Sequence, residues 1–214
     1  GFSTAMKPSL TIAVASLAIT GTLVADTPTI EPVVVDSAPK IDGKLDDAVW
    51  DGNPPVTGFT QRDPNEGAKP TERTELRVAR SETHLFLAFR CYDSEPEKIV
   101  RKVMQRDTSM APDDSVFVLI DPFGREHEGF LFQLNANGAK VDGKLSSRSP
   151  SPDPNWDALW NGAATIDDGG WNAEFAIPFR SINFDPNITA WSINFQRRIA
   201  RKQEQIRWTA AIRN

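Results

Sequence analysis

Trp-Asn-Ala-Glu-Phe-Ala-Ile-Pro, at residues 171–178, is the stretch of this chain that decides its fold. Apolar residues recur at every second position from Trp171 to Ile177, and Pro178 ends the pattern. A period of two is typical of a β-strand that buries one face. Residues 191–196 repeat the alternation and predict a second strand of the same kind.

Two uninterrupted apolar runs add further strands. Residues 85–89 read Leu-Phe-Leu-Ala-Phe and residues 116–120 read Val-Phe-Val-Leu-Ile, which predicts strands buried on both faces. Asn-Gly at residues 137–138 is a strong hairpin signal. The 16 prolines and 13 glycines oppose long helices. We therefore predict an all-β fold, an antiparallel β-sandwich of immunoglobulin-like or jelly-roll-like type with one or two short helices.

The clearest helix signal lies at residues 94–104. Residues 94–97 read Ser-Glu-Pro-Glu, which has the form of a capping box with proline in the first turn. An apolar stripe follows at residues 99–104. We expect one short helix here, and a single helical turn between Asp46 and Trp50.

The N-terminal region divides the chain into three expected parts. Residues 1–25 resemble a secretory signal peptide, because a basic start at Met6 precedes an apolar stretch too short to span a membrane. Residues 1–5 would be a cloning scar. Residues 26–39 are expected to form a linker with one edge strand, and residues 40–214 the sandwich. The protein would thus be exported to the periplasm, the outer membrane or the extracellular space.

Composition and motifs narrow the functional class. The formal net charge of −5 argues against nucleic acid as a partner, since phosphate binding needs a basic surface. The single cysteine, Cys91, cannot form an internal disulfide and lies in an apolar run. The sequence contains no Gly-x-Ser-x-Gly motif, and its 29 acidic residues do not single out a catalytic pair. These absences weaken an enzyme hypothesis without excluding one.

Aromatic and amide side chains carry the positive signal. Trp156 and Trp160 directly follow a loop rich in Pro and Ser at residues 146–154. Sugar rings present apolar C–H faces, on which tryptophan stacks, and a rim of hydroxyls, which amides, carboxylates and guanidinium groups bind. The alternative is that both rings fold back as a lid on the core. A second candidate surface consists of polar residues on strand faces, with arginines beside them: Gln133, Asn135, Ser192, Asn194, Gln196, Arg90 and Arg106. Its alternative is a solvated sheet face.

Asp113 and Asp114 are adjacent acids at the start of a predicted strand. Hard cations take oxygen ligands, so the pair is a candidate calcium site. The pair is equally compatible with a turn or, through Asp114, with binding of sugar hydroxyls.

Several segments together resemble one known family. Ile-Asp-Gly-Lys-Leu-Asp-Asp-Ala-Val-Trp at residues 41–50 is similar to the opening motif of the carbohydrate-binding module family 9-like domains. The late Trp-x-x-Glu-x-x-Ile-Pro strand at residues 171–178 is similar too. Further segments, at residues 85–93, 113–122 and 132–138, resemble the family in the same order, and the resemblance covers roughly residues 36–214. The ending, at residues 191–198 and 207–208, resembles a subgroup in which the module precedes an outer-membrane β-barrel.

The resemblance implies a β-sandwich that binds glycans through a pair of tryptophans and commonly holds calcium. Trp156 or Trp160 would supply one side of the pair, and Phe59 stands where the other tryptophan is expected. The chain would end where the barrel begins.

Three functional hypotheses follow. The first is a non-catalytic, monomeric module that binds oligo- or polysaccharide through Trp156, Trp160, Arg90, Arg106, Asp114, Asn135 and Gln196. The second is a structural periplasmic domain that accompanies an outer-membrane barrel and has no sugar ligand. The third is a glycoside hydrolase or part of one.

Overall fold

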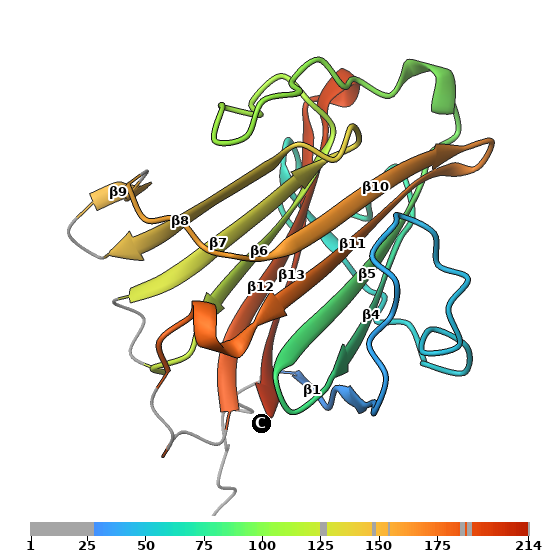
Figure 1. Cartoon of the computed structure of the whole chain (residues 1–214). Coiled ribbons are helices and arrows are strands. Elements are labelled where there is room, and N and C mark those ends of the chain that lie inside the picture. The colour runs from blue at the N-terminus through green and yellow to red at the C-terminus, as the bar shows by residue number, and fades with distance from the viewer. Residues whose placement is uncertain are drawn as a thin grey trace, which may run out of the picture.

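The computed structural model describes residues 28–124, 128–146, 149–153, 155–184, 187 and 190–213. The expected signal peptide at residues 1–25 lies outside these residues. About half of the described chain forms two β-sheets packed face to face, and three short 3₁₀ turns accompany them (Figure 1). The prediction of a β-sandwich is confirmed.

The first sheet has eight strands. Its order is β1 (Thr29–Ile30), β13 (Glu204–Arg213), β12 (Ala190–Ile199), β6 (Ser115–Asp121), β7 (Glu128–Asn135), β8 (Lys140–Ser146) and β9 (Ser149–Asp153), while β3 (Thr60–Asp63) also pairs with β13. The β1–β13 pair is parallel and the other pairs are antiparallel. The predicted hairpin at residues 137–138 joins β7 to β8, and Gly138 adopts the left-handed φ of 83° that the turn needs.

The second sheet has five strands. Its order is β10 (Asn161–Asp167), β11 (Gly170–Pro178), β5 (His84–Tyr92), β4 (Thr74–Arg80) and β2 (Val33–Val34). The β2–β4 pair is parallel and the remaining pairs are antiparallel.

The core lies between the sheets and is rich in aromatic rings. Phe89 on β5 packs on Phe175 of the same sheet and on Phe195 of the facing sheet, with ring centroids 5.8 and 6.0 Å apart. The alternating residues of β11 and β12 therefore point inward, as their period predicts. Cys91 is fully buried, and burial raises the pKa of its thiol to about 11, so it packs as a small apolar group.

The predicted helix at residues 94–104 is wrong. Only the 3₁₀ turn η1 (Pro96–Lys98) forms there, and the chain then runs without regular structure to Met104. Side-chain carboxylates capture the backbone instead: Asp114 accepts a hydrogen bond from the Val100 amide, and Asp113 accepts bonds from the amides of Lys102 and Val103. These bonds compete with helical pairing and hold the segment extended against the start of β6.

A segment near the N-terminus covers part of the outer face of the five-stranded sheet. Trp50 is buried there against Phe86, Ala88 and Ala176. Glu174 on β11 fixes this segment, because its carboxylate accepts bonds from the indole Nε1 of Trp50 (2.9 Å) and from the amide of Gly43 (2.8 Å). The two motifs at residues 41–50 and 171–178 are therefore in direct contact.

Candidate functional site

The outer face of the eight-stranded sheet presents a row of planar side chains. By strand register, Gln133 on β7, Phe117 on β6, Gln196 on β12 and Arg207 on β13 are consecutive neighbours across four strands. Their sequence neighbours on each strand are buried or, for Trp208, partly buried against the core, so these four side chains point outward. We call this set the amide row.

Local hydrogen bonds orient the amide row. Gln133 donates through Nε2 to the hydroxyl of buried Ser115 (3.1 Å), and Gln196 donates through Nε2 to Oδ1 of Asn194 (2.7 Å). At the far end, Arg207 forms an ion pair with Glu66 (2.7 Å). Phe117 is half-buried and lies between two fixed amides that are only 8% and 9% exposed, so the row offers an apolar ring flanked by largely buried hydrogen-bonding groups.

Half-buried apolar side chains continue this face beyond the amide row. Leu119 on β6 and Leu131 on β7 are cross-strand partners one step from Phe117 and Gln133, and both keep part of their surface exposed. The prediction that residues 116–120 are buried on both faces is therefore wrong for Phe117 and Leu119, which contribute to an open surface.

Trp160 does not offer an open ring face. Its side chain is only 6% exposed, its ring stacks on Phe175 with centroids 5.4 Å apart, and its Nε1 donates to Asp142 (2.8 Å). Trp156 is partly buried and packs on Phe130 and Phe132 with centroid distances of 4.9 and 6.1 Å. Both rings form a lid over one open edge of the sandwich, so the prediction of an exposed stacking platform is wrong for Trp160.

Asp113, Asp114 and Asn135 are fully buried and act on the backbone. Asn135 donates through Nδ2 to Asp113 (2.8 Å) and to the carbonyl of Val103 (2.8 Å), which completes the anchor of the extended segment before β6. Burial raises the pKa of Asp114. The prediction that Asp114 and Asn135 bind a ligand directly is therefore not supported by their positions.

The same geometry tests the expected calcium site. Both oxygens of Asp113 accept hydrogen bonds from amide groups, and Asp114 leaves one buried oxygen, Oδ1, without a partner. One such oxygen falls well short of the six to eight ligands that calcium takes. Within the described residues, no group of three His, Cys, Asp or Glu side chains could hold a metal ion. The residues at this position do not fit calcium.

Arg90 lies far from the amide row, on the outer face of the five-stranded sheet. It lines a hollow of about 500 Å³ and forms a bidentate ion pair with Asp167, at 2.6 and 2.9 Å. It also donates to Asn172 (3.1 Å) and lies over the ring of Tyr92 at 5.0 Å. Its hydrogen-bonding capacity is therefore largely used within the protein.

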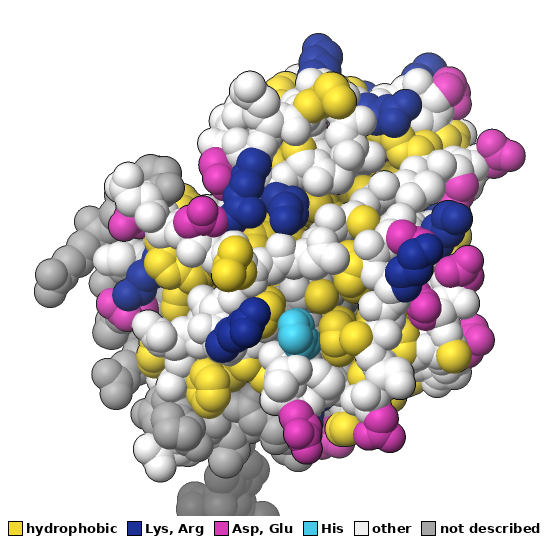
Figure 2. Space-filling model, viewed as in Figure 1, with side chains coloured by type: hydrophobic (Ala, Val, Ile, Leu, Met, Phe, Trp, Pro, Cys, Tyr) yellow, Lys and Arg dark blue, Asp and Glu magenta, His cyan; other side chains and the backbone are white. Residues whose placement is uncertain are grey.

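Arg106 lines another hollow, of about 390 Å³, together with His84, Lys140 and Arg180. Figure 2 shows this side of the molecule, where Lys and Arg side chains gather around a histidine. Arg106 itself donates to Asp142 (2.8 Å) and is bonded to Asp157. Trp160 lines the same hollow but shows it little of its surface.

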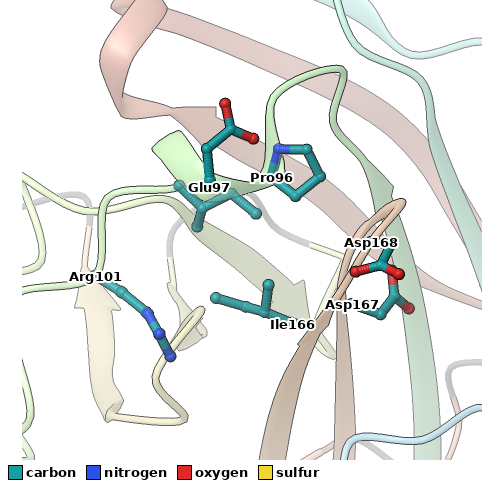
Figure 3. A pocket seen from close by; sticks show the side chains of 7 residues that line it. Pro96, Glu97, Arg101, Ile166, Asp167 and Asp168 are labelled. Carbon is teal, nitrogen blue, oxygen red and sulfur yellow. The ribbon is translucent and has the colours of Figure 1, made fainter.

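A further hollow of about 400 Å³ lies between η1 and the turn that joins β10 to β11 (Figure 3). Pro96 and Glu97 lie on one side of it, Asp168 on another and Arg101 opposite, with Ile166 between them. Sequence analysis did not single out this hollow.

The structure thus distributes the predicted site residues over separate places. Gln196 is the one that belongs to the amide row, and Gln133, which shares its polar strand pattern, lies beside it. Phe117 was missed, because an unbroken apolar run does not reveal which of its side chains remain exposed. No helix within the described ranges is long and apolar enough to cross a membrane.

Comparison with solved structures identifies the fold. One similar structure is a carbohydrate-binding module of family 9 from Caldicellulosiruptor kristjanssonii in complex with glucose, with a TM-score of 0.62, 14% identity, and coverage of 86% of this chain and 94% of that chain. The complex of such a module from the same organism with cellotriose gives a TM-score of 0.58, 15% identity, and coverage of 86% and 92%.

A protein from Bacteroides uniformis that is described as carbohydrate-binding gives a TM-score of 0.64, 12% identity, and coverage of 86% and 91%. No family model and no curated protein matches the sequence. The chain therefore has the β-sandwich fold of carbohydrate-binding module family 9, at sequence identities that carry the fold alone.

Proposed function

We propose that this domain is a non-catalytic carbohydrate-binding module and that its binding surface is the amide row. The observation that carries the proposal is the cross-strand placement of Phe117 between Gln133 and Gln196 on an outer sheet face. Solved structures with the same fold hold glucose and cellotriose, which supports an oligosaccharide as the ligand class.

The chemistry of the row suits a sugar ring. The C–H face of a pyranose would pack on Phe117, and its hydroxyls would exchange hydrogen bonds with the flanking amides, which offer both donors and acceptors. Gln133 and Gln196 are uncharged, so binding through them requires no ion to be removed from water. Their existing bonds to Ser115 and Asn194 limit the side-chain entropy that binding would cost.

We also propose that the domain acts outside the cytoplasm. The support is the apolar N-terminal segment with a basic start, which has the form of an export signal. Detection of the protein in the periplasmic or membrane fraction, with residues 1–25 removed, tests this part independently of sugar binding.

Calorimetric titration of the full chain with glucose and with cellotriose tests the proposed site. Phe117→Ala should weaken binding about tenfold, which corresponds to about 1.4 kcal/mol. Gln133→Ala and Gln196→Ala should each weaken it about fivefold, because each removes a neutral hydrogen bond of about 1 kcal/mol. Asn172→Ala, an amide deletion on the other sheet's outer face, is the matched control and should bind like wild type.

The titrations distinguish a wrong choice of binding surface from an absence of carbohydrate binding. Equal affinity in wild type and all three row variants would place the sugar elsewhere on the molecule. Absence of binding heat with either sugar, and with a wider panel of oligosaccharides, would refute carbohydrate binding and favour a structural domain. Circular dichroism of each variant shows whether the fold is retained.

A further inference from the structure

Arg198 lies beside the amide row, and its guanidinium has no partner among the residues that the structure describes. It follows Gln196 by two residues on β12, so both side chains emerge from the same outer face. No described residue forms a hydrogen bond or ion pair with the side chain of Arg198, and its Nε is buried without a partner. A buried donor without a partner costs free energy, which a suitable acceptor would recover.

The neighbours of Arg198 place it within reach of a ligand on the row. By register it lies between Ser115 on β6 and Gln205 on β13. Ser115 is the residue whose hydroxyl accepts the Gln133 amide, so Arg198 is one step along the strands from the row. Asp63 on β3 lies beyond Gln205 and is paired with Arg62 at 3.9 Å.

Other half-buried or buried arginines show how this protein satisfies a guanidinium. Arg90 is paired with Asp167, and Arg201 donates to Asp93 at 2.8 and 2.9 Å. Arg197, the next residue before Arg198, points to the opposite face and donates to the carbonyls of Arg73 and Tyr92. The Nε of Arg197 is also buried without a partner, but its two terminal nitrogens are bonded, whereas the side chain of Arg198 has no partner among the described residues.

We propose that the amide row selects acidic sugars and that Arg198 binds the carboxylate of a uronic acid residue. This inference rests on the proposed carbohydrate-binding function and deepens it. The planar guanidinium matches a carboxylate through two parallel hydrogen bonds, while Phe117 and the amides hold the ring. The protein carries a net charge of −5, so an acidic glycan needs a local cation to bind here.

The test compares two ligands that differ only in charge. Cellotriose and cellotriose oxidised to the carboxylate at carbon 6 are titrated into the full chain at low and at physiological salt. Wild type should bind the oxidised ligand at least tenfold more tightly at low salt, with a smaller preference at higher salt. Arg198→Gln should abolish the preference and leave cellotriose affinity within about twofold of wild type. Arg198→Lys should keep part of the preference, since an ammonium keeps the charge but cannot form two parallel hydrogen bonds with a carboxylate.

Arg180→Gln is the matched control, because it removes the same charge from an exposed position away from the row and should keep the preference. Equal affinity for both ligands in wild type would overturn the inference and leave the proposed function intact. A preference that survives in Arg198→Gln would also overturn it. Binding of neither ligand would refute the proposed function and this inference with it. Competition by sodium sulfate at the concentration of the oxidised ligand would indicate a general anion site and overturn the assignment to a uronic acid.

Discussion

The two outer faces of the sandwich differ in what becomes of their polar groups. On the five-stranded sheet, the segment at residues 41–50 lies over β5 and β11, and Glu174 binds its backbone and Trp50 (Figure 1). Arg90 on the same sheet is paired with Asp167. On the eight-stranded sheet, the outward side chains of β6, β7 and β12 form a row of one aromatic ring and two amides.

The comparison suggests that contacts which stabilise the fold lie on one outer face, while the groups proposed to bind a ligand lie on the other. Buried polar groups on the first face are matched by partners within the chain, so that face holds the domain together. The second face leaves the Nε of Arg198 without a partner and keeps Phe117 partly exposed. Natural proteins match most buried polar groups, so an unmatched one on an outer face suggests a partner from outside the chain.

The largest expected loss of stability comes from Glu174→Gln, on the outer face of the five-stranded sheet. Both Glu174 oxygens accept hydrogen bonds, Oε2 from the amides of Asp42 and Gly43 and Oε1 from the Trp50 indole. A glutamine amide would place donors against one of these groups, so we expect a loss of about 3 kcal/mol in the free energy of unfolding. Urea unfolding measures it.

Glu97→Gln, a change of the same type at an exposed position on η1, is the control for Glu174→Gln and should leave stability unchanged. Near-wild-type stability of Glu174→Gln would mean that the contact between the two motifs contributes little to the fold.

A smaller effect comes from Asp114, and it depends on pH. Burial raises the pKa of this carboxyl in the folded state. Its contribution to stability is therefore complete below the unfolded pKa, near 4, and is lost as the pH rises through the folded pKa. Asp114→Asn cannot ionise, so it should gain stability relative to wild type between pH 4 and pH 7.

Thermal unfolding of wild type and Asp114→Asn across that range measures the trend. Asp168→Asn, on the exposed turn between β10 and β11, should show no comparable change with pH. A constant difference between Asp114→Asn and wild type from pH 4 to pH 7 would contradict a raised pKa.

The periodicity of the sequence was sufficient to predict the strands. It was insufficient to predict the hydrogen bonds between segments that lie far apart in the sequence. The alternation at residues 171–178 correctly predicts which side of β11 faces the core, because a strand has only two faces. It does not predict that Glu174 and Ala176 on the other side are buried as well. The helix at residues 94–104 failed because Asp113 and Asp114, ten or more positions later, bind its amides. No local propensity records such a bond.

The candidate site was predictable in part for the same reason. Gln133 and Gln196 stand out as amides on polar strand faces, but their alignment needs the strand order β7–β6–β12, in which four further strands separate β7 from β12 in sequence. Trp160 looks exposed in sequence because it follows a polar loop, whereas in space its ring stacks on Phe175. The burial of a residue after a loop depends on where the chain goes in space, and its neighbours in sequence do not reveal this.

The smallest expected change in stability gives the most direct comparison of the two faces, because it concerns one arginine on each. Arg90→Gln leaves Asp167 without its bidentate partner and should lower the free energy of unfolding by about 0.5 kcal/mol, as is typical of a partly exposed ion pair. Arg198→Gln removes a guanidinium that has no described partner, so stability should stay the same or rise slightly. Both are measured by urea unfolding without ligand. A loss for Arg198→Gln as large as that for Arg90→Gln would show that Arg198 supports the fold, and the two faces would then differ in coverage but not in the role of their arginines.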